Sequence, residues 1–261
     1  MNRIDKKFKE LKKLNKKAFI VYLTVGYPNI NTTEKLIMEL SKSGVDMFEL
    51  GIPFSDPLAD GPIIQEASAD ALKHQINLEK VFGLTKRLRS KLDIPLLAMG
   101  YFNPILDYGI DKFAKKAKQS GLDAIIVPDL PIDESGILKK ALLKNGIYLI
   151  NFIAPTTDKK RTERILSQSK GFIYYVSLTG VTGTRDSLPD DVVKKVKGLK
   201  KIAKIPVCVG FGVSKRSQFK QVAAFSDGVI VGSAIIKKIK ENKSNKNLVS
   251  KIASFAKNLL P

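Results

Sequence analysis

The chain of 261 residues is 44% hydrophobic and contains only 12 prolines and 18 glycines, which excludes a low-complexity or disordered protein. Its single cysteine, Cys208, excludes an internal disulfide framework and a zinc site built on cysteines. No apolar run approaches the roughly 18 residues of a membrane span, and the amino terminus lacks the apolar segment of a secretory signal. We therefore expect a cytoplasmic protein that has no membrane partner.

The formal net charge of +20 is typical of proteins that bind nucleic acid. However, the basic residues are mostly lysines, the chain has no tryptophan, and lysine doublets such as Lys139-Lys140 recur along its whole length. Nucleic-acid sites favour arginine side chains and clustered aromatic rings instead. We therefore predict a solvated, lysine-rich surface and no nucleic-acid partner, which a mobility-shift assay with a salt series would test.

The first element in chain order is a predicted helix with a narrow apolar stripe among lysines. The stripe consists of Ile4, Phe8, Leu11 and Leu14 at helical spacing. Its width favours a helix that covers one end of the domain over a helix that lies on a membrane surface.

The rest of the chain alternates short apolar runs with longer helical patterns. The runs lack polar alternation, as expected for parallel strands that are covered on both faces. The predicted strands are 19–25, 47–50, 95–99, 124–127, 147–153, 172–177, 206–210 and 228–232. The predicted helices between them include 32–43, 78–91, 109–120, 133–144, 158–168, 189–203 and 214–225. Two segments, SGVDMFEL and SGLDAIIV, repeat one pattern in which a helix stops and a strand starts.

Eight strand–helix units in this length predict an α/β fold. We expect a single (β/α)8 TIM barrel over residues 1–261, with an extra N-terminal helix and a short helix after the eighth strand. A doubly wound open sheet is the alternative, but the first strand is not followed by a dinucleotide-binding fingerprint. In such barrels the functional residues lie at the carboxyl ends of the strands and in the loops that follow them.

Two carboxyl groups lie at the end of the second strand and in the loop after it. Glu49 falls within an apolar strand end, so its charged form is disfavoured unless it has a partner. Asp60 follows in a loop rich in proline and glycine that can fold back over the barrel mouth. A buried carboxyl beside a better-solvated one forms a candidate acid–base pair with separated pKa values. A salt bridge inside the barrel for Glu49, and a turn or cap for Asp60, are the alternatives.

Three late loops, 180–184, 210–214 and 232–234, are rich in glycine. Many barrels bind phosphate with the loops after strands seven and eight and with the N-terminus of a short extra helix, which here would be Ser233–Ile239. Glycine lets the backbone approach the phosphate closely. The pattern therefore predicts a phosphorylated substrate. Loop 179–189 has the length and polarity of a lid over that substrate, with an ordinary exposed loop as the alternative.

Four segments of the chain resemble one enzyme family. They read FELGIPFSDPLADGPIIQ at 48–65, NFIAPTT at 151–157, YYVSLTGVTGTR at 174–185 and VGFGVS at 209–214. They resemble the family of tryptophan synthase alpha subunits, and the similarity extends over essentially the whole chain. The resemblance implies a lyase of L-tryptophan biosynthesis that cleaves indole-3-glycerol phosphate to indole and glyceraldehyde 3-phosphate with neither metal nor cofactor.

The resemblance also implies roles for individual residues. Glu49 would protonate the indole ring carbon and help to remove the glycerol hydroxyl proton, while Asp60 would bind the indole N–H. Tyr174 would lie near the substrate, and Thr182 would meet Asp60 when the lid closes. The residues implied to line the indole pocket are Tyr22, Met99, Ile126 and Phe152. Those implied to bind the phosphate are Gly183, Phe211, Gly212, Gly232 and Ser233.

A partner is implied as well. The family's alpha subunit docks on a beta subunit that carries pyridoxal phosphate, in an αββα heterotetramer, with loop 53–62 and the segment around Asn103-Pro104 facing the partner. The chain departs from the family pattern at Tyr27, where aspartate is usual, and at Thr179, where some members have arginine. Another phosphosugar-processing barrel and a non-catalytic subunit that only activates its partner are the alternatives. The intact Glu49–Asp60 motif argues against both.

Overall fold

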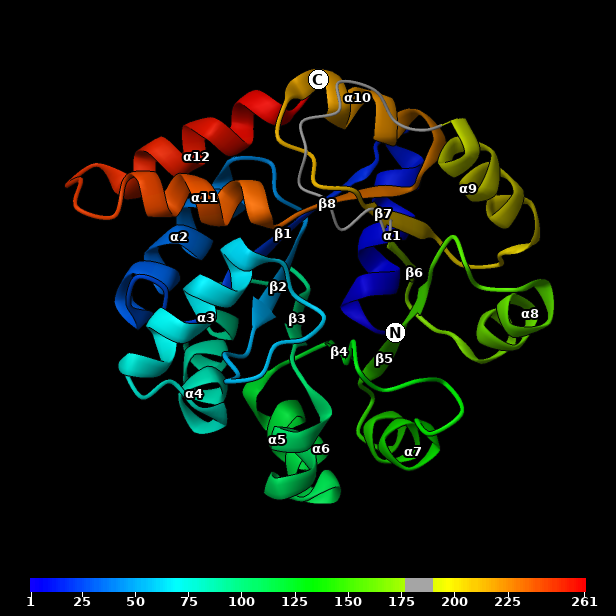
Figure 1. Ribbon diagram of the computed structural model, residues 1–261, viewed down its shortest axis with the longest axis horizontal. Coiled ribbons are helices and arrows are strands. Elements are labelled where there is room, and N and C mark those ends of the chain that lie inside the picture. Colours follow the sequence, from blue (N-terminus) through cyan, green and yellow to red (C-terminus); the bar gives the residue numbers. More distant parts are fainter. Residues whose placement is uncertain (177–189) are drawn as a thin grey trace.

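The computed structural model describes residues 1–176 and 190–261. Eight parallel strands form a closed barrel in which each strand pairs with the next and β8 pairs with β1 (Figure 1). The predicted TIM barrel is confirmed, and the predicted strand bounds lie within about one residue of those observed. The strands are β1 (Ala18–Thr24), β2 (Met47–Gly51), β3 (Leu96–Met99), β4 (Ala124–Ile126), β5 (Tyr148–Ile153), β6 (Ile173–Val176), β7 (Val207–Gly210) and β8 (Gly228–Val231).

Helices surround the ring of strands, and one helix lies across its end (Figure 1). Asparagine or aspartate oxygens accept backbone N–H groups at the starts of several of them, including Asn29, Asn77 and Asp158. The helices are α1 (Arg3–Lys13), α2 (Ile30–Lys42), α3 (Pro62–Lys73), α4 (Leu78–Arg89), α5 (Phe102–Tyr108), α6 (Ile110–Ser120), α7 (Gly136–Lys144), α8 (Lys159–Gln168), α9 (Asp190–Ile202), α10 (Arg216–Phe225), α11 (Ser233–Glu241) and α12 (Leu248–Leu259).

Some helix boundaries differ from the prediction because turns precede the helices. The helix predicted from residue 133 begins at Gly136, since the N–H groups of Glu134 and Ser135 both bind the Pro131 carbonyl in a turn. Helix α5 is absent from the predicted elements. It contains Pro104, but this proline lies in the first turn, where a missing N–H does not break a helix.

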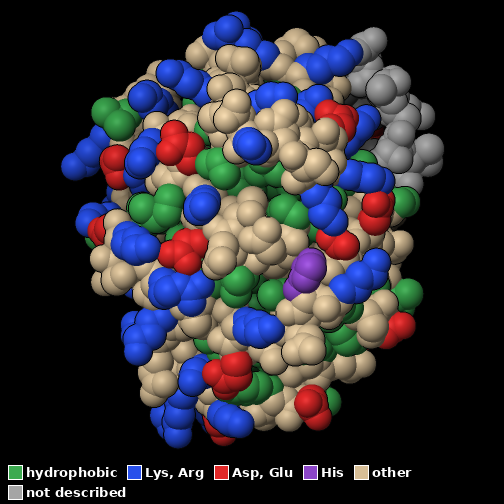
Figure 2. All heavy atoms as spheres, turned by 90° about the vertical axis from the view of Figure 1, so that its left-hand side faces the viewer, with side chains coloured by type: hydrophobic (Ala, Val, Ile, Leu, Met, Phe, Trp, Pro, Cys, Tyr) green, Lys and Arg blue, Asp and Glu red, His purple; other side chains and the backbone are tan. Residues whose placement is uncertain are grey.

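On the face shown in Figure 2, lysines and arginines are scattered among aspartates and glutamates rather than gathered in one patch, as expected for a solvated lysine-rich surface. Within residues 1–176 and 190–261, no helix is both long and apolar enough to cross a membrane. The same residues contain no cluster of three or more histidine, cysteine, aspartate or glutamate side chains arranged to hold a metal ion.

Helix α1 closes the amino-terminal end of the barrel, as its apolar stripe predicts. Ile4, Phe8 and Leu11 are buried against side chains of the barrel interior, and the ring centroids of Phe8 and Phe172 lie 5.9 Å apart. The prediction for Leu14 is wrong. The helix ends one residue earlier, and the Leu14 side chain is 57% exposed.

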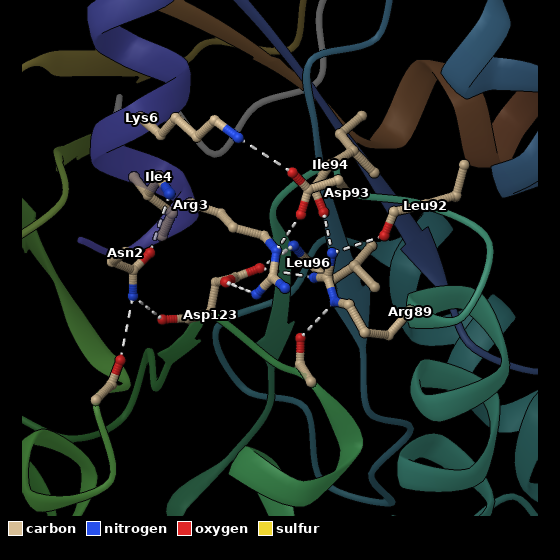
Figure 3. A network of polar contacts seen from close by, with 12 residues as sticks. Asn2, Arg3, Ile4, Lys6, Arg89, Leu92, Asp93, Ile94, Leu96 and Asp123 are labelled. Carbon is tan, nitrogen blue, oxygen red and sulfur yellow. Dashed lines mark hydrogen bonds and ion pairs between the residues drawn. The ribbon is translucent and has the colours of Figure 1, made fainter.

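A polar network fixes α1 to the barrel (Figure 3). The Asp123 side chain is only 4% exposed and accepts hydrogen bonds from Arg3 Nη1 at 3.1 Å and Arg89 Nη2 at 2.8 Å. It also accepts the backbone N–H of Leu96 at 3.0 Å. Asp93, by contrast, is 68% exposed and pairs with Arg3 Nε at 2.6 Å on the outside of the network. The network therefore joins α1 to the C-terminal end of α4 and to the starts of β3 and β4.

The aspartates of the repeated segments SGVDMFEL and SGLDAIIV have the same structural role. Asp46 and Asp123 each lie immediately before a strand, and each accepts a backbone N–H from the neighbouring strand. Asp227 occupies the same position before β8 and accepts the N–H of Val207 at 3.0 Å. These aspartates join adjacent strands at the amino-terminal end of the barrel. The loops that carry the candidate site lie at the opposite end, where the strands have their carboxyl ends.

Candidate active site

The candidate pocket residues lie on strands whose side chains point into the barrel at alternate positions. The strand register pairs Tyr22 with Glu49 and Phe152 with Tyr174, and the ring centroids of the second pair lie 4.9 Å apart. Met99 and Ile126 are paired in the same way on β3 and β4. The structure thus brings together these predicted residues from six strands: Tyr22, Glu49, Met99, Ile126, Phe152 and Tyr174.

Glu49 is fully buried within β2. Neither of its carboxyl oxygens has a hydrogen-bond partner among residues 1–176 and 190–261. In that part of the chain it forms no salt bridge, so the structural alternative for Glu49 finds no support there. Burial disfavours the charged form and raises the pKa of Glu49 to about 8. A carboxyl with this pKa can both give and take a proton near neutral pH.

Asp60 is held at the mouth of the barrel by an aromatic side chain from the next strand–helix loop. The Tyr101 hydroxyl donates to Asp60 Oδ2 at 3.0 Å and accepts the Ala59 N–H at 3.0 Å. The Tyr101 ring stacks on Phe54 with centroids 5.2 Å apart. Burial raises the pKa of Asp60, while the Tyr101 hydrogen bond acts in the opposite direction. Asp60 is therefore more than a turn residue, because its carboxylate has a fixed orientation.

Tyr101 was not among the predicted site residues, and neither was Gly51. A Cβ atom at Gly51 would lie 2.1 Å from the hydroxyl oxygen of Tyr22, so only glycine leaves room for the phenol. Gly210 plays the same part for Tyr174, whose ring would lie 2.9 Å from an added Cβ. For the two glycines the signal in the sequence was their position, since each is the last residue of an apolar strand.

Four of the predicted phosphate-binding residues lie after two neighbouring strands: Phe211 and Gly212 after β7, and Gly232 and Ser233 after β8. Gly212 has a φ of 63°, and apart from its chain neighbours no heavy atom of residues 1–176 and 190–261 lies within 4 Å of the place where its Cβ would be. Gly232 is the N-cap of α11 and Ser233 is its first residue. The first N–H groups of a helix have no acceptor within the helix and carry a partial positive charge. This arrangement is suited to an anion, with Phe211 beside it.

Three predicted features lie outside the described residues: Thr182, Gly183 and the remainder of the lid at 179–189. The rest of the candidate site is contained in residues 1–176 and 190–261. Within that part of the chain it consists of a buried carboxyl without a hydrogen-bond partner, an oriented carboxylate, an aromatic and aliphatic barrel interior, and a helix N-terminus suited to an anion. Together these features suit a substrate that has both an aromatic part and a phosphate.

Comparison with known proteins gives one consistent result. The model of the family described as "Tryptophan synthase alpha chain" matches residues 8–260. The chain is 42% identical over 259 residues to a tryptophan synthase alpha chain of Thermoanaerobacter sp. (strain X514), covering 99% of this chain and 98% of the relative. It is 46% identical over 241 residues to that of Geotalea uraniireducens (strain Rf4), covering 92% and 90% respectively.

Solved structures agree with the sequence comparison. The crystal structure of tryptophan synthase subunit alpha from Legionella pneumophila str. Paris superimposes with a TM-score of 0.93 at 38% identity, over 99% of this chain and 97% of that chain. A chain of the tryptophan synthase complex from Pyrococcus furiosus gives a TM-score of 0.86 at 34% identity, over 93% and 97%. With a family model that spans nearly all of its length, this chain belongs to the tryptophan synthase alpha chains, the lyases that cleave indole-3-glycerol phosphate in tryptophan biosynthesis.

Proposed function

We propose that Glu49 is the acid–base group of indole-3-glycerol phosphate cleavage and that Asp60 assists it. Glu49 gives its proton to the ring carbon that bears the glycerol chain, which produces a positively charged indolenine. Asp60 accepts a hydrogen bond from the indole N–H and stabilises that charge. The bond between the ring and the glycerol chain then breaks as the adjacent hydroxyl loses its proton to Glu49. Indole and glyceraldehyde 3-phosphate are released, and Glu49 regains its proton.

The observation that carries this proposal is the buried Glu49 carboxyl without a partner. A carboxyl that is neutral near pH 7 can deliver a proton, whereas an ionised and solvated one cannot. Burial raises the pKa of Glu49 to about 8, which supplies this neutral form. Burial raises the pKa of Asp60 as well, but Asp60 differs from Glu49 in that its carboxylate accepts a hydrogen bond from Tyr101, which opposes this effect and favours the ionised form. The two carboxyls therefore have separate chemical roles.

The pH dependence of the reaction tests this assignment. The free enzyme must hold a proton on Glu49, so kcat/KM for indole release is expected to fall as the pH rises through about 8. The measurement is a profile of initial rates at low substrate concentration between pH 6 and pH 9.5, with folding checked at each end by circular dichroism. A kcat/KM that rises through this range would show that Glu49 acts first as a base.

We propose that the substrate phosphate binds at Gly212 and at the N-terminus of α11. Two features support this assignment: the space that the described residues leave at Gly212, and the first N–H groups of α11, which have no acceptor within the helix. Gly183 and Phe211 would complete the phosphate site, and Thr182 would contact Asp60 from the lid.

Two substitutions that introduce side chains of nearly the same shape test the phosphate site. Gly212→Asp and Gly212→Asn introduce the same strain at a φ of 63° and nearly the same volume, but only aspartate repels the phosphate. We expect Gly212→Asp to raise KM about tenfold or more above the KM of Gly212→Asn, which corresponds to about 1.4 kcal/mol of lost binding. The comparison is made by steady-state kinetics. Equal KM values for the two variants would remove the phosphate from this position.

We also propose that the chain docks on a tryptophan synthase beta subunit in an αββα assembly, through loop 53–62 and α5. The supporting observation is the exposure of apolar side chains there, with Leu58 92% exposed and Leu106 54% exposed. One solved relative is described as a tryptophan synthase complex. The alpha chain family carries no cofactor, and pyridoxal phosphate belongs to the beta subunit.

A further inference from the structure

Tyr22 carries a hydroxyl group into a site whose chemistry otherwise depends on two carboxyls. The side chain is 7% exposed and points inward from β1, in register with Glu49 on β2. An added Cβ at Gly51 would meet the phenol tip, its hydroxyl oxygen at 2.1 Å and Cζ at 2.5 Å. Gly51 lies two residues beyond Glu49 on the same face of β2, so the phenol tip lies just beyond Glu49 toward the barrel mouth.

The hydroxyl proton of Tyr22 is available for donation. Thr24, the next inward residue on β1, is 1% exposed and donates its own hydroxyl to the Tyr22 oxygen at 3.4 Å. A hydroxyl group has one proton and two acceptor lone pairs, so accepting from Thr24 leaves the phenol proton free. Burial and the nearby Asp60 and Glu49 raise the pKa of Tyr22, which keeps the phenol protonated throughout the working pH range.

The ionised carboxylate of Glu49 requires a hydrogen-bond donor. Both of its carboxyl oxygens lack a hydrogen-bond partner in residues 1–176 and 190–261, so the Tyr22 hydroxyl does not bond to either of them in the structure. The buried negative charge that remains when Glu49 gives up its proton therefore requires a nearby donor to turn toward it. The ionisable groups that interact electrostatically with Glu49 in that part of the chain are Tyr22 on β1, Tyr174 on β6 and Cys208 on β7. Of these, Tyr22 is the group whose oxygen accepts a hydrogen bond from a neighbouring hydroxyl, that of Thr24, so its own proton is free to point elsewhere.

We propose that Tyr22 is a positioning residue that donates its hydroxyl proton toward the Glu49 carboxylate and stabilises this carboxylate whenever Glu49 has transferred its proton. The inference rests on the proposed role of Glu49. It goes further by giving Tyr22 a part in the step in which Glu49 regains its proton. Tyr22 stabilises the Glu49 carboxylate, and Glu49 accepts the hydroxyl proton of the substrate. Thr24 orients the phenol, and Gly51 provides the space that the phenol occupies.

Tyr22→Phe keeps the ring and removes only the hydroxyl. A hydrogen bond to a charged group favours that charged form, so its loss should make Glu49 harder to ionise. We expect the midpoint of the Glu49 titration to rise by about 0.5 to 1 pH unit in the variant. The alkaline fall of kcat/KM should move upward by the same amount, with little change in KM.

The titration is measured directly by ¹³C NMR on the full chain labelled at the glutamate side-chain carboxyl carbons. The Glu49 resonance is the one that is absent from Glu49→Gln. Tyr175→Phe is the matched control, because Tyr175 is also a buried tyrosine but follows Tyr174 directly on β6, so its side chain points to the opposite face of that strand. Its loss should leave the Glu49 midpoint unchanged. Gly51→Ala, which displaces the phenol without removing it, should raise the midpoint as Tyr22→Phe does.

An unchanged Glu49 midpoint in Tyr22→Phe, or an equal rise in Tyr175→Phe, would overturn the inference. So would a rise that disappears in the Asp60→Asn background, because the phenol would then act on Asp60. The NMR titration does not depend on turnover. If Glu49→Gln retained full activity, the proposed function would fail, whereas an unchanged midpoint beside an inactive Glu49→Gln would remove only the role of Tyr22.

Discussion

Glu49→Gln is expected to lower kcat for indole release by about 10²- to 10⁴-fold, the range usual for loss of a general acid–base group. Glutamine has nearly the same shape but cannot deliver or recover a proton. The fold should be retained, because a carboxyl with a pKa of about 8 is already mostly neutral at pH 7 and an amide replaces it without a change of charge. Steady-state release of indole and thermal unfolding of the same preparation measure the two effects.

The matched control is Glu66→Gln. Glu66 is an exposed carboxylate on α3 that pairs with Lys240 at 2.6 Å, and its removal should leave both rate and stability nearly unchanged. Near wild-type cleavage by Glu49→Gln would show that another group transfers the proton. A large fall in the melting temperature of Glu49→Gln would show instead that the charged form of Glu49 has a structural role.

Asp123→Ala is expected to cost about 3 to 5 kcal/mol of unfolding free energy, as is typical when one partner of a buried ion pair is removed. The substitution leaves the Arg89 guanidinium, which is only 13% exposed, without its carboxylate, and it leaves the Leu96 N–H without its side-chain acceptor (Figure 3). It also weakens the attachment of α1, because Arg3 bonds the same carboxylate. Denaturant unfolding followed by circular dichroism measures the loss.

Asp93→Ala is the comparison for this network. Asp93 also pairs with Arg3, but it is 68% exposed, so the loss should be at most about 1 kcal/mol. The difference between the two aspartates follows from burial, since both contact the same arginine. Equal losses of unfolding free energy for Asp93→Ala and Asp123→Ala would show that burial does not decide how strongly each aspartate fixes α1 to the amino-terminal end of the barrel.

The regular part of the fold was predictable because it depends on local pattern. The eight apolar runs gave strands within about one residue, and the stripe on α1 predicted burial of Ile4, Phe8 and Leu11. The deviations occurred where local signals compete. Pro104 reads as a helix breaker, yet it lies in the first turn of α5, and residues 131–135 form a turn although Asp133 resembles a helix start.

The candidate site was predictable only in part. Glu49 and Asp60 were found from a carboxyl in an apolar strand end and a second carboxyl in the following loop. Tyr101 was not, because its hydrogen bond to Asp60 joins residues 41 positions apart, and only the closed barrel brings their loops together. The space that Gly51 leaves for Tyr22 depends in the same way on the register of two strands, which sequence spacing does not specify.

The most direct test of the account is the release of indole from indole-3-glycerol phosphate by the purified chain, measured with and without a cognate beta subunit. We predict slow release by the chain alone and much faster release with the beta subunit, since a partner that favours the productive state raises the activity. Absence of indole in both conditions, from chain shown to be folded, would contradict the assignment of Glu49 and Asp60 as a working catalytic pair.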